Sequence, residues 1–191
     1  MTSSEKRAAL DELAKQIINC KNCGLCETAI NAVPGEGNAD SEIVFIGEAP
    51  GATEDQTGRP FVGRAGKLLE FMLGQIGYKR EDIWIGNIIK HRPPDNRDPM
   101  PEEIKACQPF LTRQLEIINP KIIVTLGRFA MNYFALDAKI SLDHGKPLEI
   151  KSHIVYPVYH PAAGLRNPKM KLALIEDFLE IPKILKEAKE K

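Results

Sequence analysis

Neither charge is in excess in this chain of 191 residues, because 26 Lys and Arg residues balance 26 Asp and Glu residues. Net charge therefore gives no reason to expect a polyanionic partner such as nucleic acid. Long apolar runs are also missing, since none approaches the roughly 20 residues that a membrane-spanning helix needs. The charged, amphipathic N-terminus lacks the apolar core of a signal peptide. These absences favour a cytoplasmic protein that does not bind membranes.

Cysteine is scarce as well, but three of the four residues, Cys20, Cys23 and Cys26, lie close together, while Cys107 stands apart. In a reducing compartment, clustered cysteines indicate a metal site rather than disulfides. The trailing Cys26 extends C-x2-C to the spacing of ferredoxins. A zinc site made of two close pairs would need a second pair, which the chain lacks. Spacing alone leaves two alternatives open, an iron–sulfur cluster or a zinc site that includes His91.

Two nucleotide-binding motifs are absent. In the glycine-rich stretch 47–66, Gly58 and Gly63 have the gap of a P-loop, but Arg64 stands where that motif requires Lys. The dinucleotide pattern GxGxxG is missing too. We expect this stretch to follow an irregular path that lets a flat ligand approach the backbone. Phe61 is either a stacking face for that ligand or a core residue.

Strand-like and helix-like segments alternate along the chain at βαβ spacing, with no internal repeat, low-complexity tract or linker. The strand-like segments are continuous apolar runs, which is typical of a parallel sheet covered on both faces. We therefore predict one domain over residues 1–191, a three-layer α/β/α fold with a central four-stranded parallel sheet. The predicted strands are 42–47, 82–90, 121–127 and 153–161, and the last predicted helix, about 170–189, is interrupted or kinked at Pro182.

Polar side chains follow three of these strands. Glu48 comes after the first strand, Asn87 and a stiff basic loop belong to the end of the second, and His160 belongs to the end of the fourth. Ligands of open α/β sheets bind outside the carboxyl ends of the strands. We therefore expect a carboxylate, an amide and an imidazole to converge on one crevice.

Three blocks resemble, in sequence and in order, the signatures of the family 4 uracil-DNA glycosylases. They read GEAPGATEDQTGRPFVGRAGKLL, NIIKHRPPDNRDPMPEE and HPAAGLRNP. The resemblance extends from about Cys20 to beyond Pro168. It implies the α/β/α fold, a [4Fe-4S] cluster and hydrolysis of the N-glycosidic bond of uracil in DNA. Such a reaction releases free uracil, leaves an abasic site and begins base excision repair.

The resemblance also implies a role for each matched residue. Glu48 matches the acidic residue that orients or activates water, and His160 matches the histidine beside the uracil O2. Phe61 matches the aromatic residue on which the flipped uracil stacks, and Asn87 matches the amide that reads the polar edge of the base. Glu54 resembles the residue that crowds C5 of the base and excludes thymine. No amine nucleophile is indicated, so we expect a monofunctional hydrolase.

Candidate DNA contacts lie on the loops that border the expected crevice. We expect Lys90, Arg92, Arg97 and Arg166 to contact phosphates, because the chain as a whole carries no net charge. Leu165 is the candidate for filling the stack that the flipped base leaves. The expected partner is uracil-containing DNA, bound by a monomer, and replication or repair proteins are further candidates.

His91 occupies an unusual place in the second block. The family pattern usually reads Lys-Cys-Arg-Pro-Pro, and its cysteine is a cluster ligand, so the matched set here is Cys20, Cys23, His91 and Cys107. Imidazole replaces thiolate on cluster iron in Rieske centres. The rival ligand is Cys26, which would complete a four-cysteine set. We favour His91, because its position matches the family ligand and prolines stiffen its loop.

Two other classes of function compete with the enzyme. One is a non-catalytic DNA-binding or polymerase-associated iron–sulfur module of the same fold, against which Glu48, Asn87 and His160 argue. The other is a small iron–sulfur electron carrier, which would need neither a glycine-rich pocket nor an aromatic stacking residue. An assay for uracil release distinguishes all three.

Overall fold

A mixed six-stranded sheet, in the order β1-β3-β2-β4-β6-β5, forms the centre of the computed structural model, which describes residues 1–150 and 153–190. The four inner strands are parallel, so the prediction of a central four-stranded parallel sheet is confirmed. Each edge carries one short antiparallel strand that the sequence did not predict. The strands are β1 (Glu36–Gly37), β2 (Ile43–Gly47), β3 (Trp84–Asn87), β4 (Ile122–Leu126), β5 (Leu148–Ile150) and β6 (His153–Val158).

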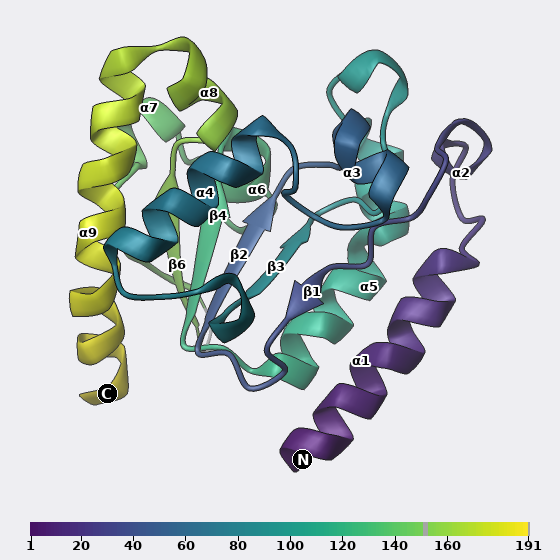
Figure 1. Cartoon of the computed structure of the whole chain (residues 1–191), viewed down its shortest axis with the longest axis horizontal. Coiled ribbons are helices and arrows are strands. Elements are labelled where there is room, and N and C mark those ends of the chain that lie inside the picture. Colours follow the sequence, from purple (N-terminus) through teal and green to yellow (C-terminus); the bar gives the residue numbers. More distant parts are fainter. Residues whose placement is uncertain (151–152, 191) are drawn as a thin grey trace.

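Helices cover both faces of the sheet (Figure 1). Successive side chains of a strand point to opposite faces, so Phe45 of β2 packs in the core under α4 and α9, and Val44 packs in the core under α1 and α5. This is the three-layer arrangement expected from the continuous apolar runs. The four long helices are α1 (Ser3–Ile18), α4 (Arg64–Gln75), α5 (Pro101–Ile118) and α9 (Pro168–Glu190).

Local signals explain where two of the long helices, α1 and α5, begin. Thr2 and Glu5 form a reciprocal capping box at the start of α1. Pro101 occupies the first turn of α5, where its missing N–H is no loss, and Glu103 accepts from the backbone N–H of Met100. The beginnings of these two helices therefore have local causes in the sequence.

The predictions of an interruption at Pro182 and of an irregular glycine-rich stretch were wrong, whereas a kink at Pro182 stays a prediction. The helix α9 runs through Pro182 without interruption, because the neighbouring Ile181, Ile184 and Leu185 are buried against the sheet and their burial outweighs one lost hydrogen bond. The glycine-rich stretch is not wholly irregular, since it contains α3 (Ala52–Thr57), which ends at Gly58 with a left-handed φ of 69°. Four further short helices are α2 (Leu25–Thr28), α6 (Arg128–Phe134), α7 (Ile140–Asp143) and α8 (Pro161–Arg166).

No helix within residues 1–150 and 153–190 combines the length and the apolar character needed to cross a bilayer.

Candidate active site

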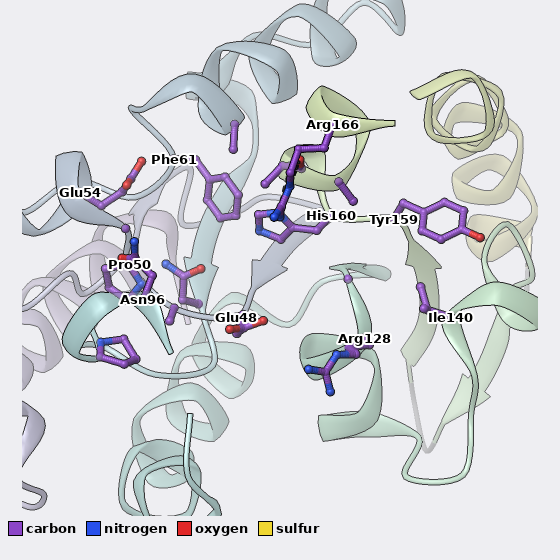
Figure 2. A pocket seen from close by; sticks show the side chains of 18 of the residues that line it. Glu48, Pro50, Glu54, Phe61, Asn96, Arg128, Ile140, Tyr159, His160 and Arg166 are labelled. Atoms are coloured by element: carbon purple, nitrogen blue, oxygen red, sulfur yellow. Dashed lines mark hydrogen bonds between the residues drawn. The ribbon is translucent and has the colours of Figure 1, made fainter. Parts of the chain in front are cut away.

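A cavity of about 610 Å³ opens at the carboxyl ends of the four parallel strands. Glu48 follows β2, Asn87 ends β3, Gly127 follows β4 and His160 lies just beyond β6. The expected convergence of a carboxylate, an amide and an imidazole is therefore observed. Figure 2 shows Glu48 and His160 beside the opening, together with Phe61 from the glycine-rich stretch.

A narrow slot separates Asn87 from Phe61. Asn87 pairs with Gly47 across the β3–β2 ladder, and a Cβ at Gly47 would lie 2.5 Å from both the Asn87 Oδ1 and the Phe61 Cζ. Glycine at this position therefore keeps open the space between an amide and an aromatic face. The Asn87 side chain is buried, and its Oδ1 has no hydrogen-bond partner among the described residues. A buried acceptor of this kind is costly unless a ligand donates to it.

His160 faces the same slot as a neutral imidazole. Its ring centroid lies 5.8 Å from that of Phe61, and its Nδ1 accepts a hydrogen bond from the Ala162 backbone N–H at 3.1 Å (Figure 2). The ring proton is therefore on Nε2. Burial lowers the pKa of His160 to about 4, and the charge of Arg166 adds to this effect while Glu54 opposes it. At neutral pH the residue offers an uncharged N–H donor.

Glu48 is half-buried and lines the same cavity. Its pKa is raised to about 7, chiefly by burial and also by the nearby Asp98, while Arg128 opposes both effects. Arg128 and Asp98 form an ion pair at 2.6 Å, so each charge partly neutralises the other near the Glu48 carboxyl. Glu48 therefore changes ionisation near neutral pH.

Glu54 anchors the loop that carries Phe61. Its Oε1 accepts hydrogen bonds from the backbone N–H groups of Val62 at 2.9 Å and Gly63 at 2.8 Å. Glu54 also lines the cavity, beside the slot between Phe61 and Asn87. The anchoring contacts give it a structural role that the sequence did not indicate, and a role in excluding thymine stays a prediction.

The expected DNA contacts divide into accessible residues and one buried residue, Lys90. Arg97 and Arg166 line the cavity, Arg92 lies on the same loop as Arg97, and Leu165 is 41% exposed on α8. Arg97 is already paired, because its guanidinium forms a bidentate contact with Glu103 at 2.6 and 3.0 Å. These four positions are compatible with a DNA surface.

Lys90 does not belong to that surface, and the expectation that it contacts a phosphate was wrong. Its side chain is 1% exposed, and its Nζ donates to the Asn87 carbonyl and to Gln114 Oε1, each at 2.8 Å. Gln114 in turn donates to the carbonyl of Pro34 at 2.7 Å. Burial lowers the pKa of Lys90 to about 8, an effect that Cys107 opposes. Lys90 thus supports the backbone of β3 from inside the protein.

The cysteines lie at a second region. A smaller hollow of about 200 Å³ is lined by Cys20, Cys26 and His91, and His91 is 5% exposed. Cys107 is buried in the apolar core cluster against which Cys23 packs. Burial raises the pKa of Cys107, while a backbone hydrogen bond at Lys90 and the charge of Lys90 oppose that rise. Across the described part of the chain, however, no three His, Cys, Asp or Glu side chains are already arranged around one metal position. Soft thiolates with an imidazole suit iron–sulfur or zinc chemistry, so the donor types fit either group.

Comparison with known proteins identifies the family. Residues 34–181 match the family model described as the Uracil DNA glycosylase superfamily. The chain belongs to this superfamily. Within it, the chain is 49% identical to a type-4 uracil-DNA glycosylase of Archaeoglobus fulgidus, over 91% of this chain and 92% of that protein. It is 48% identical to the type-4 uracil-DNA glycosylase of Sulfurisphaera tokodaii, over 91% and 83% of the two chains. The expected membership of the type-4 uracil-DNA glycosylases is therefore confirmed.

Two residues that shape the cavity were missed in the sequence. Arg128 lines the cavity directly after Gly127, at the carboxyl end of β4, and the rule that located Glu48 and Asn87 could have found it. Gly47 keeps the slot open, but its sequence neighbours carry no sign of this, because the close approach to Phe61 arises only in the folded chain.

Proposed function

We propose that this protein hydrolyses the N-glycosidic bond of uracil in DNA, releasing free uracil and leaving an abasic site. The observation that carries the proposal is the buried Oδ1 of Asn87, which has no hydrogen-bond partner among the described residues and faces the slot beside Phe61 in a cavity shared with Glu48 and His160. The names of the type-4 relatives support the same activity.

The slot accounts for recognition of a base that has left the DNA stack. Asn87 presents an acceptor for the uracil N3–H and, from its amide nitrogen, a donor for O4. Phe61 supplies a flat apolar face on which the base stacks. Stacking and edge hydrogen bonds offset the cost of extruding the base, which is a few kcal/mol and smallest in a weak pair.

His160 and Glu48 account for cleavage. Breaking the bond places negative charge on the departing base and positive charge on the sugar. The Nε2–H of His160 donates to the uracil O2 and stabilises the leaving anion, without any need for a charged imidazole. The ionised Glu48 stabilises the sugar cation and orients the attacking water.

Strand cleavage by an amine is not part of the proposed reaction. None of the residues lining the cavity in the described chain is a lysine, so no amine is placed to form a Schiff base with the sugar. The product is therefore an intact strand with an alkali-labile abasic site.

The cysteine region is proposed to hold a [4Fe-4S] cluster through Cys20, Cys23, His91 and Cys107, with Cys26 as the rival for His91. The donor chemistry supports this set. Cys20, His91 and Cys26 line the same hollow, so the match of His91 to the family ligand position is what favours it over Cys26. When bound, the cluster would supply cross-links between the N-terminal segment, the loop after β3 and α5. Through His91, the cluster would bind the loop that directly follows Asn87 at the end of β3.

DNA is proposed to lie across the mouth of the cavity. Arg92, Arg97 and Arg166 would contact phosphates, and Leu165 would fill the vacated stack. We further propose that a monomer performs the reaction and that replication or repair proteins are its additional partners.

The decisive experiment incubates the cluster-loaded protein with a single-stranded or U:G oligonucleotide in the absence of magnesium, followed by alkali. Free uracil and alkali-labile sites are expected, and the matched oligonucleotide with thymine should stay intact. Binding of uracil-containing DNA without release would instead favour the non-catalytic module. Neither binding nor release, with an intact redox-active cluster, would favour the electron carrier.

A further inference from the structure

The residue that carries the stacking ring has a strained backbone. Phe61 adopts a φ of 50°, in the left-handed region that aromatic residues rarely occupy. Its ring is only 6% exposed and is directed between Gly47 and His160. Because relaxing this φ would swing the ring away from the slot, other residues must hold the backbone in place.

Arg80 makes the contacts that can do this. It belongs to a short 3-10 turn, Arg80–Asp82, just before β3, and its side chain is 16% exposed. Its Nη1 donates to the Phe61 carbonyl at 2.9 Å, and its Nη2 donates to the Pro60 carbonyl. One guanidinium therefore holds the two carbonyl groups that flank the strained φ and ψ of Phe61.

The guanidinium is itself held in position. Arg80 Nε donates to Glu36 Oε1 at 2.7 Å, and Glu36 lies on the edge strand β1. Arg59 binds the same carboxylate at 2.8 and 2.9 Å, but none of its side-chain hydrogen bonds within the described chain reaches the Phe61 backbone. Arg80 and Arg59 thus share one partner and differ in whether they contact the loop.

The other side of the loop is fixed independently. Glu54 binds the two backbone N–H groups that follow Phe61. A Cβ at Gly66 would lie 1.8 Å from the Phe61 oxygen, so glycine there leaves room for this carbonyl. The peptide groups before and after the stacking ring are therefore both anchored, and Arg80 provides the anchor on the carbonyl side.

We propose that Arg80 is a positioning residue for base recognition, which orients the Phe61 ring toward the extruded base and is held by Glu36. The inference rests on the proposed function, in which Phe61 stacks on uracil. Arginine is required because its planar fork reaches two carbonyls and a carboxylate together, whereas the single ammonium of lysine cannot reproduce this geometry.

The first experiment measures kcat/KM for Arg80→Met and the inhibition constant of free uracil. The loss of an ordered stacking face should lower kcat/KM about tenfold and weaken inhibition by free uracil by a similar factor. Free uracil does not contact the DNA surface, so its weaker inhibition separates a positioning role from loss of a phosphate contact. The matched control, Arg59→Met, should keep both constants within about twofold of the wild type.

The second experiment is a double-mutant cycle with Phe61→Ala, which should lower kcat/KM by about tenfold to a hundredfold. If Arg80 acts through the ring, Arg80→Met has almost no further effect once the ring is gone. An equal loss in both backgrounds, or no loss in the wild-type background, overturns the proposal.

A folding defect, a failure of the proposed function and a failure of the positioning role give three different results. If Arg80→Met does not fold at the assay temperature, Arg80→Lys replaces it, because lysine keeps the charge opposite Glu36 but lacks the planar fork of arginine. The double-mutant cycle with Phe61→Ala is then repeated with Arg80→Lys and tests the positioning role in the same way. A wild-type protein that releases no uracil would refute the proposed function. An active wild type with additive Arg80 and Phe61 variants would refute only the positioning role.

Discussion

The cavity at the strand ends and the cysteine region differ in how far the chain alone assembles them. In the cavity, Asn87 is fixed by the β3–β2 ladder and His160 by its bond to the Ala162 N–H. In the cysteine region, three thiols are only half-buried, and within the described residues no metal-binding group is assembled. The difference teaches that contacts within the fold already fix the side chains of the cavity, whereas the described residues show no comparable arrangement of the proposed cluster ligands.

The loop after β3 joins the two regions. Asn87 belongs to the cavity, His91 belongs to the hollow with Cys20 and Cys26, and the buried ammonium of Lys90 lies between them and binds the Asn87 carbonyl. Metal binding that depends on folding normally stabilises the segments it connects. We therefore expect cluster loss to affect stability strongly and the geometry of the slot less.

The largest effect is expected in the cavity, from Asn87→Asp. The carboxylate cannot donate to O4 and would repel it, so uracil release should fall about a thousandfold, with cytosine release as the candidate residual activity. Release of each base from matched oligonucleotides measures this. Asn96→Asp is the charge-matched control, because exposed Asn96 lines the same cavity and accepts from Arg92, so a general charge effect on DNA binding lowers release in both variants and only the loss beyond it belongs to the slot. Unchanged uracil turnover in Asn87→Asp would remove Asn87 from the slot.

The next effect concerns the cysteine region and decides between two ligand sets. With His91 as a ligand, His91→Ala should lose iron and visible absorbance and melt at a lower temperature, His91→Cys should keep the cluster, and Cys26→Ala should stay loaded. Iron content and thermal melting are the measurements. A brown, fully loaded His91→Ala together with a colourless Cys26→Ala would assign the site to Cys26.

A smaller effect should appear in the pH profile. The raised pKa of Glu48, about 7, means that its carboxylate is lost as pH falls through neutrality. Cleavage that needs the carboxylate should decline about tenfold per unit below that pKa and level off above it. His160, with a pKa near 4, stays neutral and should add no inflection between pH 5 and 9. Profiles of kcat/KM for wild type and Glu48→Gln test this, and a wild-type profile without the inflection would contradict the role of Glu48.

The smallest effect separates buried from exposed cations. Arg92→Gln, Arg97→Gln and Arg166→Gln should each reduce the salt dependence of DNA binding by about one unit of slope. Lys90→Met should leave the slope unchanged and lower the free energy of unfolding by about 1–3 kcal/mol, because two buried acceptors lose their donor. Salt titrations and denaturant unfolding provide the two readouts. A slope change in Lys90→Met equal to that of the arginine variants would place Lys90 at the DNA after all.

Local patterns in the sequence determined the four parallel strands and, through the strand-end rule, the convergence of Glu48, Asn87 and His160. Continuous apolar runs indicate strands that are buried on both faces of a sheet. The carboxyl ends of parallel strands meet at one edge of the sheet, independently of the conformation of the loops. The two edge strands escaped prediction because β1 and β5 have only two and three residues, too few to show a period.

Only the tertiary structure decided which cations are exposed and how the stacking ring is held. Lys90 stands in a basic loop sequence, yet its Nζ is buried against Gln114, 24 residues away. Arg80 reaches Glu36 across 44 residues and Phe61 across 19. Such contacts depend on which segments the sheet brings together, so they cannot be predicted from residue type and local spacing.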